Sequence, residues 1–188
     1  RTTNRHDLSL KPPRKTMLDL LKDAGRDVIA VGKIFDIFDG EGVTEKIKTT
    51  GNTNGIAFTK ALQTRDFEGL AFVNLVDFDM LYGHRRDVAG YAAAATEFDK
   101  FVADFIPGMR EGDILMVTAD HGCDPSYTKT TDHTREYVPY LICGKGVKPG
   151  VDLGTKLCFG TIAQTICDYL GVDASTLDGQ SVLSDILK

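Results

Sequence analysis

The chain has 188 residues, of which 26% are charged, and its formal net charge is -5. This length suits one domain with an ordinary hydrophobic core, and the acidic balance argues against a general nucleic-acid-binding surface. No apolar run approaches the roughly 18 residues that cross a bilayer, so we expect no membrane partner.

The cysteines indicate a reducing compartment. Cys123, Cys143, Cys158 and Cys167 show no Cys-x-x-Cys spacing, and residues 1–5 contain no apolar signal segment. We therefore expect reduced thiols in a cytoplasmic protein. Cys123 is a weak candidate for a metal contact. Because the chain begins at an arginine, we interpret it as the C-terminal part of a longer protein.

From about residue 11, apolar spacing predicts alternating helices and strands. In chain order these are a helix over 17–24, a strand over 27–32, a helix over 54–62, a strand over 70–76, a helix over 88–106, strands over 113–118 and 138–143, and a helix over 161–170. Gly25 and Gly171 are natural ends for the first and last helices. This alternation predicts an α/β fold whose mainly parallel sheet has helices on both faces.

Three of the four histidines lie in short segments that contain aspartate. These segments are Asp77-Phe78-Asp79-x4-His84, Thr118-Ala119-Asp120-His121-Gly122 and Asp132-His133-Thr134-Arg135-Glu136. Carboxylate and imidazole together suit Mn²⁺ or Zn²⁺, and two of the segments follow predicted strands, where ligands of such sheets collect. We therefore predict a metal centre whose ligands are Asp79, His84, Asp120, His121 and His133.

The neighbours of these ligands have supporting roles in this prediction. We expect Gly83 to let the backbone turn so that Asp79 and His84 reach one cavity, and Gly122 to do the same for Asp120 and His121. Asp77 and Asp87 are expected at the surface or behind the ligands. Arg135 and Glu136 are expected to orient the His133 ring.

The evidence for a phosphate site is weaker. Lys33 follows the strand over 27–32 and could bind a phosphate as a point charge, but an ordinary exposed lysine explains the spacing equally well. Arg85, Arg86 and Arg135 flank the metal segments with the same ambiguity. The sequence contains no Walker-type loop and no Gly-x-Gly-x-x-Gly motif.

Residues 118–122 resemble the metal motif of the alkaline phosphatase superfamily, a motif that alone also fits cofactor-independent phosphoglycerate mutases and several phosphodiesterases. Three further segments look like the phosphopentomutase family: Val76 to Asp87, Gly32-Lys33-Ile34 with Asp39-Gly40-Glu41-Gly42, and Asp132 to Glu136. The resemblance covers essentially the whole chain. Cys123 departs from it, because the family usually has a polar residue there.

That family interconverts ribose 1-phosphate and ribose 5-phosphate, and the deoxyribose pair, with two Mn²⁺ ions and a phosphothreonine. The resemblance implies that Asp79, His84 and His133 hold one ion, and that Asp120 and His121 hold the other. It also implies that Lys33 contacts the substrate phosphate, a role that we extend to Arg86.

The resemblance further implies how the chain is divided. Residues 1–10 would be the tail of an inserted cap domain, and 11–188 the second half of an alkaline phosphatase-like core. The nucleophilic threonine and one aspartate ligand are expected upstream of Arg1. We therefore expect these 188 residues to need the N-terminal half and to be inactive alone.

Two other interpretations remain open. One is a sister enzyme, either a cofactor-independent phosphoglycerate mutase or a metal phosphohydrolase. The other is a non-catalytic metal-binding fragment that needs a complementary polypeptide.

Overall fold

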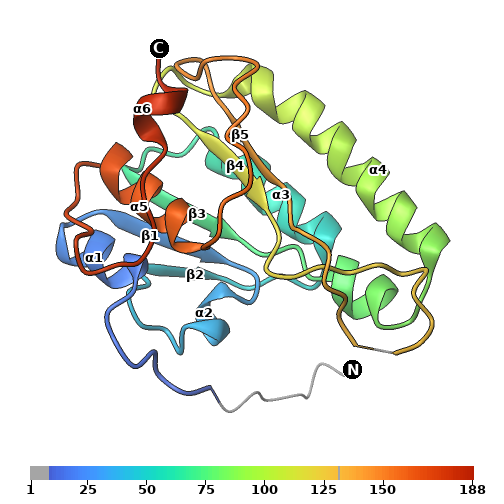
Figure 1. Ribbon diagram of the computed structural model, residues 1–188. Coiled ribbons are helices and arrows are strands. Elements are labelled where there is room, and N and C mark those ends of the chain that lie inside the picture. Colours follow the sequence, from blue (N-terminus) through green and yellow to red (C-terminus); the bar gives the residue numbers. More distant parts are fainter. Residues whose placement is uncertain (1–8, 131) are drawn as a thin grey trace. The chain divides into compact units, whose positions relative to one another are not determined.

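The computed structural model, drawn as a ribbon in Figure 1, describes residues 9–130 and 132–188. These residues fall into two compact units. The sheet unit comprises residues 9–48, Arg65–Asn74 and Val147–Lys188. The histidine unit comprises Thr49–Thr64 and Leu75–Gly146 apart from residue 131. Most of the predicted cap-domain tail, 1–10, lies outside the described residues, so that boundary stays a prediction.

A parallel sheet forms the centre of the sheet unit, as predicted. Its central strand β1 (Asp27–Val31) pairs in parallel with β2 (Glu45–Ile47) on one side and β3 (Gly69–Val73) on the other. Val28 to Val31 are at most 1% exposed, which explains their unbroken apolar sequence, because a strand covered on both faces has no polar side.

Four helices belong to this unit. They are α1 (Met17–Asp23), α2 (Ile34–Ile37), α5 (Gly160–Tyr169) and α6 (Leu183–Ile186). Helix α1 packs against β1 and α5, and Leu18 and Leu21 of α1 join Cys167 of α5 in the core. Gly25 and Gly171 follow α1 and α5 with φ of 75° and 67°, so both predicted helix ends are confirmed.

The histidine unit joins helices to an antiparallel ribbon. Its helices are α3 (Asn52–Leu62), the π-helical turn η1 (Phe78–Gly83), α4 (Val88–Phe105) and the 3₁₀ turn η2 (Ile106–Gly108). Strand β4 (Leu115–Thr118) pairs antiparallel with β5 (Tyr140–Cys143), so the second pair of strands departs from the expected parallel pattern. Pairs of α4 phenylalanines pack together, Phe98 with Phe101 and Phe101 with Phe105.

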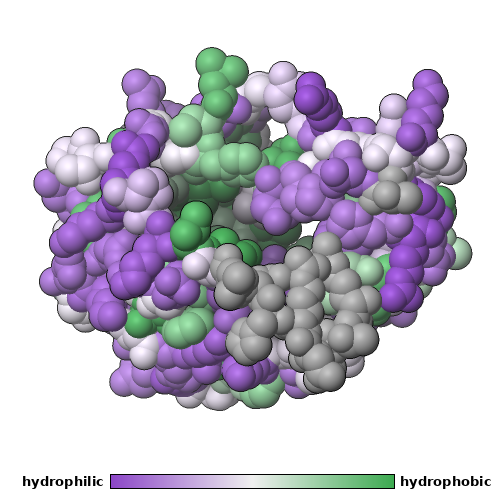
Figure 2. All heavy atoms as spheres, turned by 90° about the horizontal axis from the view of Figure 1, so that it is seen from below, coloured by the Kyte–Doolittle hydropathy of each residue, from purple (hydrophilic) through white to green (hydrophobic). Residues whose placement is uncertain are grey.

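The surface is mainly hydrophilic on the face drawn in Figure 2, where hydrophobic residues gather in smaller groups. Some large apolar side chains are exposed, among them Tyr137, Leu141 and Leu157. Among the described residues, no helix combines the length and apolar character needed to cross a membrane. Cys123, Cys143, Cys158 and Cys167 are free in the structure.

One buried hydroxyl links α5 to the turn before α6. Thr165 is fully buried, and its Oγ1 donates to the Thr161 carbonyl at 2.7 Å and accepts from the Val182 amide at 3.1 Å. Removing that acceptor would leave a buried amide without a partner, which costs about 1–3 kcal/mol.

We therefore predict that Thr165→Val lowers the free energy of unfolding by about 1–3 kcal/mol, although the two side chains have nearly the same shape. Thr165→Ser is the matched control, because it keeps the hydroxyl and loses one methyl group, worth about 1 kcal/mol. Urea unfolding of the intact protein measures both changes. A greater loss for Thr165→Ser would contradict the prediction.

Candidate metal centre

The turn η1 brings Asp79 and His84 together. A π-helical turn is closed by a hydrogen bond between residues five apart, and here the His84 amide donates to the Asp79 carbonyl at 3.0 Å. The side chains of these residues also meet, with His84 Nε2 3.2 Å from Asp79 Oδ1. The spacing of four intervening residues is thus explained by one wide turn, where the sequence had predicted only that the backbone turns at Gly83.

The other two aspartates of this segment cap helices. The Asp77 carboxylate accepts from the Asn52 amide at 2.6 Å, at the start of α3, and the Asn52 side chain accepts from the Asp77 amide at 2.9 Å. Asp87 accepts from the Gly90 amide at the start of α4. These bonds fix both ends of η1 and leave Asp79 as its available carboxylate.

The segments that carry His121 and His133 lie side by side. Gly122 and Thr134 form an antiparallel bridge, and the Thr134 hydroxyl accepts from the Asp124 amide at 2.6 Å. A Cβ on Gly122 would lie 2.7 Å from the Glu136 nitrogen and 2.8 Å from the Thr134 oxygen.

The reason for glycine therefore differs from the one expected. Neither Gly83 nor Gly122 adopts a left-handed backbone. Gly122 is needed because the backbone of Thr134 and Glu136 lies where the Cβ of any other residue would be.

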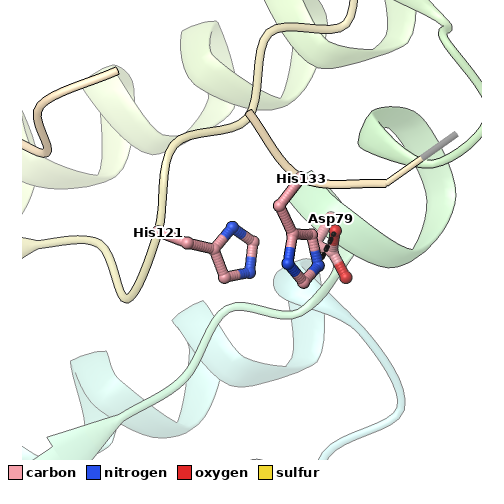
Figure 3. Close-up of side chains that lie close together, drawn as sticks. All are labelled: Asp79, His121 and His133. Carbon is pink, nitrogen blue, oxygen red and sulfur yellow. Dashed lines mark ion pairs between the residues drawn. The ribbon is translucent and has the colours of Figure 1, made fainter. Parts of the chain in front are cut away.

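Asp79, His121 and His133 form a three-residue cluster (Figure 3). One potential ligand atom from each lies within 4.8 Å of the other two. His133 Nε2 is 3.5 Å from Asp79 Oδ1, and the rings of His121 and His133 stack with centroids 3.6 Å apart. The three side chains come from η1, from the segment after β4 and from the segment before β5.

The Asp79 oxygen suits a cation. Its Oδ1 is buried and accepts no hydrogen bond from any described residue, although two imidazole Nε2 atoms lie nearby. A buried acceptor without a donor is costly, and an ion is one way to satisfy it. One carboxylate and converging imidazoles make a fitting donor set for a divalent transition metal.

The ring nitrogens of His121 are distinguished by one contact. Its Nδ1 lies 3.1 Å from the Gly122 carbonyl oxygen, which can only accept a hydrogen bond. A hydrogen bond from Nδ1 to this carbonyl would leave Nε2 as the ring nitrogen that offers a lone pair to a metal. His133 has Asp132 Oδ1 3.7 Å from its Nδ1, beyond hydrogen-bonding distance.

The other predicted site residues take different positions. Asp120 lies 3.6 Å from His121 Nε2 and is 72% exposed, outside the three-residue cluster. The sequence assigned Asp79 and His133 to one ion and His121 to the other, but the cluster contains all three. The division of the ligands between two ions therefore stays a prediction. Lys33 belongs to the sheet unit, at the residue before α2, and its phosphate contact also stays a prediction.

The side chain of Arg86 is engaged in hydrogen bonds within the protein. Its guanidinium donates to the backbone carbonyls of Asp124, Thr130 and Asp132. These contacts give no support to the predicted phosphate contact. The spacing of charged residues could not reveal this role, because the acceptors are backbone atoms from a distant part of the sequence.

Cys123 packs against the centre without being a favoured ligand. A Cβ at Gly83 would lie 2.3 Å from the Cys123 sulfur and 3.6 Å from Asp79 Oδ1. Burial and, secondarily, the Asp79 carboxylate raise the pKa of the Cys123 thiol. The thiol thus fills space beside Asp79 in its neutral form.

This packing generates a test of the centre. We predict that Gly83→Ala weakens divalent-metal binding by about tenfold or more, because the new methyl group and the Cys123 sulfur cannot both occupy the space beside Asp79. The Gly83→Ala/Cys123→Ala double variant should recover much of the affinity, with Cys123→Ala alone as the control. Isothermal titration of the intact protein measures this. If the double variant bound the metal no more tightly than Gly83→Ala, crowding between the Cys123 thiol and the new methyl group would not explain the loss of affinity.

The chain is similar in sequence to curated enzymes. Phosphopentomutase from Lachnoclostridium phytofermentans is 54% identical over 188 residues, covering all of this chain and 48% of that protein. Phosphopentomutase from Acetivibrio thermocellus is 52% identical over 187 residues, again covering 48% of that protein. The chain thus spans about half the length of these curated relatives.

A solved structure shares the fold. The crystal structure of Leishmania mexicana phosphoglycerate mutase at low cobalt concentration matches with a TM-score of 0.69 and 17% identity, over 88% of this chain and 38% of that one. At this identity the match supports the fold alone, and it confirms the expected α/β architecture. The model of the metalloenzyme superfamily matches residues 1–174, and the chain accordingly belongs to that superfamily.

Proposed function

We propose that this chain supplies metal ligands to a phosphopentomutase, which interconverts (deoxy)ribose 1-phosphate and (deoxy)ribose 5-phosphate. The observation that carries the proposal is the convergence of His121 and His133 on Asp79, whose buried Oδ1 accepts no hydrogen bond from the described residues. The identity of about half of all residues to named phosphopentomutases supports this choice of reaction.

The proposed cofactor is a pair of Mn²⁺ ions, with Asp79, His84, His133, Asp120 and His121 as this chain's ligands. When bound, such ions neutralise charge on a transferring phosphoryl group and lower the pKa of a coordinated hydroxyl. The chain's own part is to hold the ligands in place. The capped turn η1 fixes Asp79 and His84, and the Gly122–Thr134 bridge fixes His121 beside His133.

The remaining parts of the reaction are assigned by resemblance. A phosphothreonine would give its phosphoryl group to the sugar phosphate, and the bisphosphate formed would return the other one. The resemblance places that threonine upstream of Arg1, so the proposed enzyme needs its N-terminal half. Lys33 is the proposed phosphate contact within this chain. Free cysteines fit the proposed place in the cytoplasm. The proposed place in nucleoside catabolism follows from the proposed reaction.

The first test is the reaction itself. We predict that the intact protein with Mn²⁺ converts ribose 1-phosphate to ribose 5-phosphate, while the 188-residue chain alone gives no turnover. A coupled assay on samples of known intact mass measures both. Turnover of 3-phosphoglycerate or p-nitrophenyl phosphate in place of the pentose phosphate would identify a sister enzyme and overturn the proposal.

The second test concerns Asp79. We predict that Asp79→Asn lowers bound metal and reduces mutase activity by at least about 100-fold, because the amide keeps the shape but loses the charge that holds the ion. Metal analysis after gel filtration and the coupled assay measure the two effects.

Asp87→Asn is a matched control for this variant. It makes the same chemical change eight residues away, and asparagine caps a helix as well as aspartate does. Full metal content and activity in Asp79→Asn would contradict the proposed ligand.

A further inference from the structure

Arg86 occupies a backbone conformation that does not suit arginine. Its φ is 56°, and it follows the end of η1 as the left-handed residue of a Schellman-type helix end, with the Asp87 amide donating to the Tyr82 carbonyl and the Arg86 amide to the Gly83 carbonyl. Glycine usually fills this position, because a Cβ is strained there. A strained arginine persists only where its side chain is held by the surrounding structure.

The side chain of Arg86 makes such contacts. Its Nε donates to the Thr130 carbonyl at 2.9 Å, Nη1 to the Asp124 carbonyl at 3.1 Å and Nη2 to the Asp132 carbonyl at 2.6 Å. A second bond joins Nη2 to the Thr130 carbonyl. The planar guanidinium therefore gathers three backbone acceptors, which a lysine ammonium could not reproduce in this geometry.

These acceptors belong to the segment that carries His133. Asp132 directly precedes His133, and the Asp124 amide donates to the hydroxyl of Thr134, the residue after it. At its other end, Arg86 lies two residues after His84 and is fixed to η1 by the helix-end bonds. One side chain thus connects the turn that carries Asp79 and His84 with the segment that carries His133.

We propose that Arg86 is a positioning residue that holds the His133 segment against η1 and so sets the affinity of the centre for divalent metal. This rests on the proposed metal centre, but it does not need the pentose phosphate reaction. The proposal gives Arg86 a structural contact in place of the phosphate contact expected from its charge.

The test compares variants that separate backbone, charge and hydrogen bonding in the intact protein. Arg86→Gly removes the guanidinium and relieves the left-handed backbone, so any harm comes from the missing side chain. Arg86→Lys keeps the charge without the fork of donors. Arg85→Ala removes the exposed neighbouring guanidinium and is the matched control.

Two measurements are made without substrate: the Mn²⁺ dissociation constant by titration calorimetry, and amide hydrogen exchange of peptides over 124–130 and 132–136. In Arg86→Gly we expect Mn²⁺ affinity to fall about 10–100-fold, and exchange in these peptides to rise at least about tenfold. Exchange in α4 and in β1 should not change. Arg86→Lys should resemble Arg86→Gly, and Arg85→Ala should resemble the wild type.

The outcomes distinguish this proposal from the proposed function. Unchanged Mn²⁺ affinity and exchange in Arg86→Gly would overturn it, as would a rise in exchange spread evenly over all peptides. A raised KM for the sugar phosphate with unchanged Mn²⁺ affinity would also overturn it, and would make Arg86 a substrate contact. If the intact protein lacked mutase activity but Arg86→Gly still showed the expected loss of Mn²⁺ affinity and rise in exchange, the positioning role of Arg86 would be supported and the proposed function would fail.

Discussion

The metal centre depends on the wide turn η1. A hydrogen bond between residues five apart places His84 beside Asp79, where an ordinary helical turn would align residues three or four apart. The turn is held by its own flanking carboxylates, Asp77 at the start of α3 and Asp87 at the start of α4. Asp77 and Asp87 thus accept backbone hydrogen bonds, whereas the buried Oδ1 of Asp79 accepts none and faces only the imidazoles of His84 and His133.

The sequence predicted those elements whose pattern is set by burial. The helix over 88–106 and the strand over 27–32 agree closely with α4 and β1, because a helix buried on one side and a strand buried on both leave clear apolar patterns. Strand β2 was missed, since Glu45, Lys46 and Ile47 are too few and too polar to show a period. The direction of β5 was also missed, because strand pairing is set by tertiary contacts that a local pattern does not contain.

The site was predicted in part for similar reasons. Histidine and aspartate in short segments after strands identified the residues that meet, including Asp79, His121 and His133. The roles of Gly122 and Arg86 were not visible. The role of Gly122 depends on how closely the backbone of residues 134–136 approaches it. The role of Arg86 depends on backbone carbonyls, which every residue has and which therefore leave no pattern in the sequence.

The left-handed Arg86 also has a consequence for protein engineering. A redesign guided by stability alone would choose glycine at this helix end, because that residue suits the backbone. Such a protein would have a relaxed helix end, but it would lose the hydrogen bonds from the guanidinium to the His133 segment and, by our proposal, would bind its ion less firmly. A substitution chosen to relieve local backbone strain at this position would therefore come at the expense of metal binding.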